Sequence, residues 1–543
     1  MSKAFSESVL TGNLAALERA QGRAPTCAPL DPERTRVLPD GAGGLRLELR
    51  SADGAWLPFD GPTADRFPKQ LFILGSGLGG LLDAIERAGA PTRVVALEPD
   101  PGVAMLMLAR RDWTRWIETG RLRLLTGPDY ESATHCSPHV DVTEPPTVLV
   151  SPQLADHRPA EVAAAQAVAR RIIWGAEANA SARKRFAGRY LLQTFDNLGV
   201  LAREGNTASL DGLFVGHPAV VVGAGPSLDR NLPALAALQN RAVVIGADTA
   251  LRPLIAGGVR PDLMVGVDPA ELNARHLAGV VGLDDVWLAA EGSLHPSAFD
   301  GFRGRTFVFK VSDHEPWPWL RTVGLDRGRL RAWGSVVTSA FDLALRMGCN
   351  PIVFVGLDLS YPVRRPYCAN TIYDDIWRDA IAHYGCTWAQ LVDDYFTRVP
   401  DLQLPDIHGA PVRTTPHLVS FRDWLREQIA GDACRRFVNA TGAGLLHGPR
   451  LEQSPLHDVL GPMPALDHHV PERLRTAHAT GRGRASRLRA AVDGLVAHIE
   501  RPRSIRVVAR WTEFTAGTVS RADIRDRLAA VRPSLDPDAL ASP

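Results

Sequence analysis

The chain has 543 residues, which is too long for one domain and predicts about three to four of them. Hydrophobic residues make up 45% and charged residues 22%, a globular composition that excludes a disordered, collagen-like or coiled-coil chain. The 61 basic and 60 acidic side chains give a formal net charge of +1. This balance argues against nucleic acid as a partner, because such binding relies on a strongly basic surface.

Cysteine usage and the N-terminus indicate the compartment. The six cysteines are scattered, and none forms the C-x-x-C pair of a zinc knuckle or a thioredoxin motif. So few cysteines in a long chain are typical of a reducing compartment. The polar N-terminus lacks the apolar core of a signal peptide, and no run approaches the roughly 18 apolar residues of a membrane span. We therefore expect a cytoplasmic protein without a membrane-spanning helix.

The expected elements divide the chain into four regions. We expect an N-terminal leader over 1–65, a Rossmann-like domain over 66–205, a catalytic domain over 206–446 and a helical C-terminal region over 447–543. The leader contains a predicted helix at 13–21, with Asn13 as its cap, and a strand at 45–49. The next two regions alternate helical stretches with apolar runs, which are expected as strands at 71–74, 93–97, 122–125, 219–222, 242–245, 263–267, 286–289, 306–309 and 351–355. This alternation predicts an α/β fold whose central domain holds a doubly wound, mostly parallel sheet.

The first glycine-rich loop, GSGLGG at 75–80, directly follows the predicted strand at 71–74. Glu98 ends the next strand, at 93–97, and could hydrogen-bond ribose hydroxyls. The pattern is similar to a dinucleotide site and to an adenosylmethionine loop. The alternative is that the glycines only permit a tight turn in a domain without a ligand.

The second loop, GAGPSL at 223–228, follows the apolar run 219–222. No lysine follows it, so it is not the phosphate loop of P-loop kinases. Pro226 and Ser227 suit the first turn of a helix, whose free N–H groups would bind a phosphate. The alternative is an ordinary corner between a strand and a helix.

Acidic residues follow the next two strands of the central domain. Asp248 comes after the run 242–245, and Asp268 ends the run 263–267. Because the carboxyl ends of parallel strands form the ligand crevice, both acids are expected there, holding ribose hydroxyls, a metal or an acceptor hydroxyl. Each could instead be a helix cap or a turn former, although Pro269 makes capping a weaker explanation for Asp268.

Three further polar segments follow in the catalytic domain. GSVVTSA at 334–340 predicts a polar turn and a helix, with Thr338 and Ser339 capping the helix and donating to a phosphate or carboxylate. GLDLSY at 356–361 ends a buried strand, and NATGAG at 439–444 forms a polar glycine loop.

These motifs resemble the motility accessory factor family, bacterial glycosyltransferases that modify flagellin. The likeness is most specific over 197–268, and GSVVTSA, GLDLSY and NATGAG follow in the family's order. LFILGSGLGG with VVALEPD resembles the N-terminal domain of that family. The resemblance implies cytoplasmic transfer of pseudaminic or legionaminic acid, two nonulosonic acids, from the cytidine monophosphate (CMP) donor to serine or threonine of flagellin.

A second resemblance, to bacterial CMP-sialyltransferases, rests on GAGPSL, on Thr338-Ser339-Ala340 and on GLDLSY. It implies that the glycine loop borders the nucleotide, that Thr338 and Ser339 face the phosphate or carboxylate, and that Asp358 lies near the sugar or ribose. The expected catalytic residues are Asp248, Asp268 and Asp358. The expected nucleotide-binding residues are Gly223, Gly225, Pro226, Ser227, Thr338, Ser339, Gly356, Asn439 and Thr441.

The sequence departs from the family pattern at two places. Leu357 stands where the family often has glutamine, and the segment at 366–370 lacks the usual histidine. The general base is therefore open, and the histidines available for it are His276, His295, His383, His408 and His417.

No cofactor is obligatory for this reaction, because a monophosphate leaving group needs less charge neutralisation than a diphosphate. Asp248 and Asp268 could still bind a divalent metal ion, so metal dependence is left open. Three other functions also remain open. They are a magnesium-dependent enzyme like the archaeal 6-hydroxymethylpterin diphosphokinases, a non-catalytic flagellin-binding protein, and a methyltransferase that uses Glu98.

Overall fold

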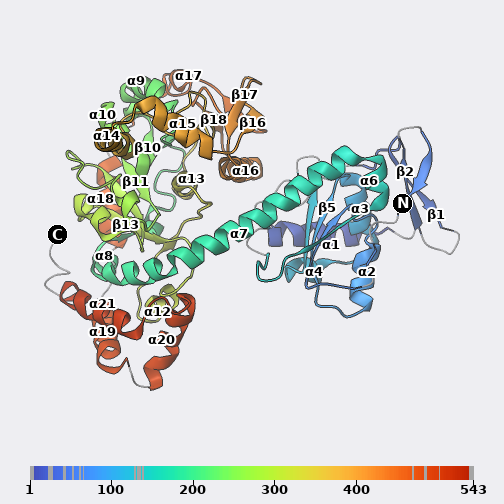
Figure 1. The fold of residues 1–543 in the computed structure, drawn as a ribbon, viewed down its shortest axis with the longest axis horizontal. Coiled ribbons are helices and arrows are strands. Elements are labelled where there is room, and N and C mark those ends of the chain that lie inside the picture. The colour runs from blue at the N-terminus through green and yellow to red at the C-terminus, as the bar shows by residue number, and fades with distance from the viewer. Residues whose placement is uncertain are drawn as a thin grey trace. The chain divides into compact units, whose positions relative to one another are not determined.

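The computed structural model describes residues 5–21, 29–40, 45–51, 54–59, 63–64, 66–127, 130, 136, 140–466, 470–481, 486–499 and 502–536. The chain divides into two compact units, Met1–Ala182 and Arg183–Pro543. The division falls within helix α7 (Pro159–Asp196), which α8 (Leu198–Arg203) follows (Figure 1). Together these two helices run from Pro159 to Arg203. Among the described residues, no helix combines the length and apolarity needed to cross a membrane.

The first unit is built on a four-stranded parallel sheet with the order β6-β5-β4-β7. Three of its strands confirm the predicted runs: β4 (Gln70–Leu74), β5 (Arg93–Glu98) and β6 (Leu122–Thr126). The sequence analysis did not identify β7 (Thr147–Val150). Helices α2 (Gly80–Arg87), α3 (Pro101–Arg110) and α4 (Thr114–Glu118) complete the Rossmann-like arrangement. A separate antiparallel sheet contains β1 (Thr35–Pro39), β2 (Leu45–Arg50) and β3 (Trp56–Pro58).

The predicted capping role of Asn13 is wrong. Helix α1 spans Glu7–Gln21, so Asn13 lies inside it, and its side chain is fully buried. The Asn13 amide donates to the carbonyls of Leu108 and Arg111 at 2.7 Å each, and its oxygen accepts from Trp113 N at 2.7 Å. These contacts fasten α1 to the end of α3. A residue type that favours caps is used here for a tertiary contact.

The second unit contains a ten-stranded sheet in which every pairing is parallel. The order is β14-β13-β12-β11-β10-β9-β15-β18-β19, and β8 pairs with β13. The strands are β8 (Gly205–Asn206), β9 (Ala219–Val222), β10 (Val243–Ala247), β11 (Leu263–Gly266), β12 (Trp287–Glu291), β13 (Thr306–Lys310), β14 (Gly328–Arg329), β15 (Ile352–Val355), β18 (Phe437–Asn439) and β19 (Leu451–Gln453). The expected fold class is confirmed. The sheet extends beyond residue 446, because β19 pairs with β18.

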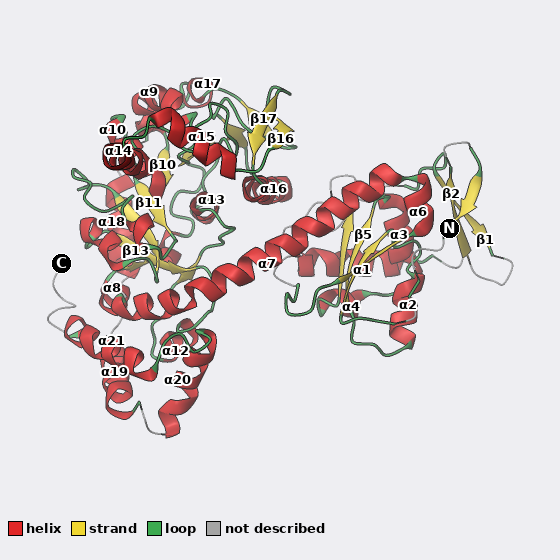
Figure 2. Cartoon of the chain, viewed as in Figure 1, coloured by secondary structure: helices red, strands yellow, loops and turns green. Residues whose placement is uncertain are grey.

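Helices cover both faces of this sheet (Figure 2). Val221 packs on one face and its neighbours Val220 and Val222 on the other, as the two-residue period of a strand requires. Two groups of three helices cover the faces. One group is α13 (Val336–Arg346), α16 (Pro416–Gly431) and α18 (Val470–Gly481), and the other is α9 (Leu228–Leu238), α10 (Leu251–Ala256) and α17 (Leu456–Leu460).

The last helices pack around a buried tryptophan. Trp511 of α20 (Pro502–Phe514) lies with its ring centroid 5.0 Å from Phe195 and 5.5 Å from Trp319. Phe195 belongs to α7, and Trp319 belongs to α12 (Trp317–Thr322). Helices α19 (Ser486–His498) and α21 (Arg521–Val531) bury leucines in the same cluster. This cluster joins the helical C-terminal region to α7 and α12 within the second unit.

Helix α18 is attached to the sheet by a buried pair, Glu204 and His478. Oε2 of Glu204 lies 2.8 Å from Nε2 of His478, and Glu204 also accepts hydrogen bonds from the backbone N–H groups of Gly304 and Thr306. Burial raises the pKa of Glu204, but the hydrogen bonds from these partners outweigh burial and lower the pKa overall.

Glu204→Ala should therefore lower the free energy of unfolding, by about 1–3 kcal/mol for each buried donor that loses its acceptor. Urea unfolding measures this change. The exposed pair of Arg303 and Asp300 is the control, and Asp300→Ala should change stability by less than about 1 kcal/mol. Equal effects of the two substitutions would contradict the anchoring role of Glu204.

Candidate active site

A cavity of about 380 Å³ opens at the carboxyl ends of four adjacent strands of the large sheet. These strands are β15, β9, β10 and β11, in that order. The position agrees with the rule that parallel sheets bind ligands at this edge. Of the residues predicted for the site, the cavity is lined by Gly223, Gly225, Pro226, Asp248, Asp268, Gly356 and Asp358.

The glycine loop after β9 packs directly against the end of β15. Gly225 N donates to the carbonyl of Gly356 at 2.8 Å. A Cβ atom on Gly225 would lie 2.7 Å from that carbonyl oxygen and 2.1 Å from Oδ2 of Asp358. Gly356 itself has φ +67°, and a Cβ there would lie 2.4 Å from the carbonyl oxygen of Gly223. The glycines are required here because two backbones meet without room for side chains.

Asp358 holds the turn that begins α9. Its carboxylate is 1% exposed and accepts hydrogen bonds from both the backbone N–H and the hydroxyl of Ser227. Burial raises the pKa of Asp358, although the bonds from Ser227 act in the opposite direction. Ser227 is buried behind the loop and does not line the cavity. The contact between Asp358 and Ser227 therefore fixes the shape of the glycine loop.

Thr338 and Ser339 lie inside α13, and both are fully buried. The Thr338 hydroxyl donates to the carbonyl of Ser335 at 2.6 Å, and the Ser339 hydroxyl donates to the carbonyl of Arg331 at 2.9 Å. Neither side chain lines the cavity; residues 334–337 line it instead. Ser335 is the N-cap of α13, and Val336 and Val337 are its first two residues. The first N–H groups of a helix have no partner within it. The start of α13 therefore presents backbone donors where the sequence suggested hydroxyls.

Asn439 and Thr441 also do not line the cavity. The Asn439 amide donates to the carbonyl of Leu446 and to the side chain of Gln453, at 2.9 Å each. Thr441 Oγ1 accepts from the backbone N–H of Leu357 at 3.2 Å. The two residues fasten the loop after β18 to the end of β15, and so they support the wall that contains Asp358.

Asp248 and Asp268 face the cavity from the ends of β10 and β11. Asp248 is 2% exposed, and its Oδ1 accepts from the N–H and hydroxyl of Thr249 at 2.7 and 3.1 Å. Burial, with a smaller contribution from the charge of Asp268, raises the pKa of Asp248 to about 7. Asp268 is half-buried, and its carboxylate accepts from Ala270 N at 2.8 Å. Asp268 therefore makes a local turn contact, although Pro269 had argued against a capping role. Asp248 thus has a carboxyl group that titrates near neutral pH.

Two of the five candidate histidines line the cavity, His276 and His417. His276 is 1% exposed, and its buried Nδ1 has no hydrogen-bond partner in the described part of the chain. Burial, together with the charges of Arg252 and Arg275, lowers the pKa of His276 to about 4. His417 is exposed at the rim, with Nε2 3.2 Å from the hydroxyl of Thr415. The other three histidines lie outside the lining.

The sequence analysis did not assign four tyrosines to the site. They come from one segment, which follows β15 and contains α14 (Ile372–Tyr384) and α15 (Trp388–Arg398). Tyr367 lies within the stretch that lacks the family's histidine, and its ring stacks on Tyr373 with centroids 4.5 Å apart. The full set that lines the cavity is Tyr361, Tyr367, Tyr373 and Tyr395. Tyr361 ends the GLDLSY motif, whereas the signal for the other three was the high tyrosine content of this segment.

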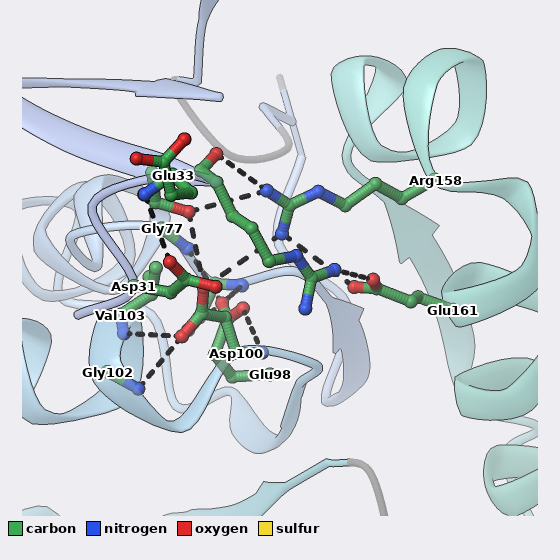
Figure 3. Close-up of polar contacts among 12 residues, drawn as sticks. Asp31, Glu33, Gly77, Glu98, Asp100, Gly102, Val103, Arg158 and Glu161 are labelled. Atoms are coloured by element: carbon green, nitrogen blue, oxygen red, sulfur yellow. Dashed lines mark hydrogen bonds and ion pairs between the residues drawn. The ribbon is translucent and has the colours of Figure 1, made fainter. Parts of the chain in front are cut away.

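The first glycine loop, in the other unit, is closed by its own chain. Glu98 is 1% exposed and accepts from the backbone N–H groups of Ser76 and Gly77 at 2.8 and 3.2 Å (Figure 3). Its second oxygen accepts from Asp100 N at 3.2 Å. A Cβ at Gly75 would lie 2.1 Å from the side chain of Leu154. The acid expected to bind a ribose is therefore bound to the loop itself.

Residues around 29–35 add to this closure. Arg158 donates to the carbonyl of Arg34 at 2.8 Å, and Asp100 accepts from the hydroxyl of Thr35 at 3.2 Å. The backbone of Leu30 lies within 2.7 Å of the position that a Cβ on Gly102 would take. The β1–β3 sheet also buries leucines against the start of α3. The geometry of the first loop matches the alternative in which the glycines at 75–80 permit a tight turn between β4 and α2.

Among the described residues, no group of three or more His, Cys, Asp or Glu side chains is arranged to hold a metal ion.

Residues 192–364 match a family model described as 6-hydroxymethylpterin diphosphokinase MptE-like. The matched segment contains the second glycine loop, both strand-end acids and Asp358. The solved structure of a Maf glycosyltransferase from Magnetospirillum magneticum AMB-1 aligns with 98% of this chain and 91% of that chain, at 16% identity and a TM-score of 0.46. No curated protein matches the sequence.

Proposed function

We propose that the protein is a cytoplasmic glycosyltransferase that moves a nonulosonic acid, of the pseudaminic or legionaminic type, from its CMP donor to serine or threonine of flagellin. One observation carries the proposal. A single cavity joins the GAGPSL loop, the start of α13 and an acid that titrates near neutral pH. The sequence resemblance supplies the donor and acceptor classes.

The donor phosphate is assigned to the amide-rich side of the cavity. Residues 334–337 lead into α13 and line the cavity together with the glycine loop, so the N-terminus of α13 faces this region. Helix N-termini bind anions through free N–H groups and the helix dipole. The ionisable side chains that line the cavity are aspartates, histidines and tyrosines. A single phosphate suits such a wall better than a polyphosphate, whose charge calls for cationic side chains or metal ions.

The reaction breaks the bond between the anomeric carbon and the phosphate oxygen, and CMP leaves with the electron pair. The acceptor hydroxyl forms the new bond to the anomeric carbon and loses its proton. We assign this proton to Asp248, because a base is most effective when its pKa lies near the working pH. Backbone N–H groups at the start of α13 stabilise the charge that develops on the leaving phosphate.

Asp268 is assigned the role of tuning Asp248, since its negative charge contributes to the raised pKa of Asp248. Asp268→Asn removes that charge, so the apparent pKa of the rising limb of kcat/KM against pH should move to lower pH. The half-buried position of Asp268 predicts that the variant folds normally. Transfer assays between pH 5.5 and 8.5, a range around the wild-type value of about 7, measure the shift. An unchanged limb, or one displaced to higher pH, would contradict the assignment.

The matched family model favours a second candidate, a diphosphokinase of the 6-hydroxymethylpterin class. Such an enzyme would bind ATP with magnesium at the same glycine loop and would use Asp248 and Asp268 toward the metal. Calorimetry with CMP and with ATP plus magnesium separates the two functions. Tighter binding of CMP supports the glycosyltransferase. Tighter binding of magnesium-ATP supports the kinase, and flagellin binding without transfer supports a non-catalytic role.

A further inference from the structure

The cavity contains a polar group that the proposed mechanism does not use, the imidazole of His276. The backbone of His276 is fixed in the turn after α11 (Glu271–Ala274), where its N–H donates to the carbonyl of Asn273 at 3.1 Å. The side chain lines the cavity and is 1% exposed, and its Nδ1 has no hydrogen-bond partner in the described part of the chain. Buried polar atoms in proteins are nearly always paired. An imidazole in a cavity wall for which the described part of the chain offers no hydrogen-bond partner points to a ligand atom.

The surroundings of His276 define what it can bind. Burial and the nearby Arg252 and Arg275 keep the imidazole neutral at physiological pH, so it carries no positive charge for a phosphate or a carboxylate. A neutral imidazole presents one donor and one acceptor. A hydroxyl or an amide group matches that pattern. His276 is therefore suited to an uncharged polar group of a ligand.

The positions of Asp248 and Asp268 indicate that His276 lies near the carbon at which transfer occurs. The His276 ring lies 5.7 Å from the ring of Tyr373, centroid to centroid. Tyr373 lines the same cavity as Asp248 and Asp268, and the charges of both acids add to the effect of burial in raising the pKa of Tyr373. The ring of Tyr367 stacks on Tyr373 and extends this wall. If Asp248 takes the acceptor proton, the sugar must lie against this wall.

We propose that His276, with Tyr373 beside it, binds a hydroxyl or amide group of the sugar carried by the CMP donor and thereby orients the sugar for transfer. This inference rests on the proposed function and deepens it. His276 is then a residue that determines specificity. The two ends of the cavity bind different parts of the donor. The start of α13 holds the phosphate, and the wall of His276 and the tyrosines holds the uncharged part of the sugar.

The test compares binding of CMP with binding of CMP-legionaminic acid and CMP-pseudaminic acid by calorimetry. His276→Phe keeps an aromatic ring and removes both nitrogens, and His276→Gln restores a donor and an acceptor. His383→Gln, an exposed position on α14, is the matched control. We expect His276→Phe to weaken the tighter of the two donors by roughly 5- to 20-fold, the effect of one lost hydrogen bond, with CMP affinity within about twofold. His276→Gln should recover part of the loss.

Three results would overturn the proposal. They are an equal loss of CMP and donor affinity in His276→Phe, no loss of either, and a wild-type protein that binds neither donor more tightly than CMP. A wild-type protein that binds neither CMP nor the donors would instead reject the proposed function itself, and this proposal with it. Melting temperatures of all variants check that each one folds.

Discussion

Gly225→Val should abolish transfer, with a loss of more than about 10²-fold in kcat/KM. The Cβ atom would lie 2.7 Å from the Gly356 carbonyl oxygen and 2.1 Å from Oδ2 of Asp358, so the loop must move away from β15. That movement displaces the part of the cavity wall that the loop forms, beside the position assigned to the donor phosphate. A displacement of about 1 Å at a reacting group costs on the order of 10²-fold in rate. A transfer assay with purified protein measures the loss, and CMP affinity should fall in parallel.

Gly77→Val is the matched control in the other glycine loop. Gly77 has φ +54°, and its N–H donates to Glu98, so valine strains that turn as well. Because the first loop is closed by its own chain, this variant should keep its transfer rate once its folding has been confirmed. If Gly77→Val abolished transfer and Gly225→Val did not, the active site would lie at the first glycine loop, in the first unit.

Asp248→Asn should lower kcat by about 10²- to 10⁴-fold, the usual contribution of a general base. The wild-type kcat/KM should rise with pH through about 7, because Asp248 accepts a proton only in its deprotonated form. This limb should disappear in Asp248→Asn. Stability should not fall, since burial disfavours the charged carboxylate that the substitution removes. A pH series of initial rates, together with thermal unfolding, measures both effects.

Asp300→Asn serves as the control for this series, because Asp300 is exposed and lies outside the cavity lining. Its rates should equal those of the wild type at every pH. A wild-type limb that survives in Asp248→Asn would assign the titration to another group, and Asp248 would lose its role as the base.

The larger strands could be predicted from the sequence, but the short and edge elements could not. Uninterrupted apolar runs such as 219–222 and 351–355 are characteristic of strands buried on both faces of a parallel sheet. The hairpin of β16 (Leu402–Pro405) and β17 (Pro411–Thr414) was missed, because proline at a strand end argues against a strand. Strands β8 and β14 have two residues each, and their positions depend on the neighbouring β13.

The site divides in the same way. Asp248 and the glycine loop could be placed because they directly follow strands, and strand ends share one edge of a parallel sheet. The orientation of Thr338 depends on which face of α13 meets the sheet, and local sequence does not determine that face. The stacking of Tyr367 on Tyr373 and the approach of His276 depend on contacts between separate segments. Such contacts become visible only in the folded chain.

The intact mass of flagellin from the native organism, with and without this gene, tests the central claim most directly. The account predicts that flagellin from the deletion strain is lighter by whole multiples of one nonulosonic acid residue. It also predicts that the wild-type gene restores the mass and that a gene encoding Asp248→Asn does not. Flagellin of identical mass in the presence and absence of the gene would contradict the account.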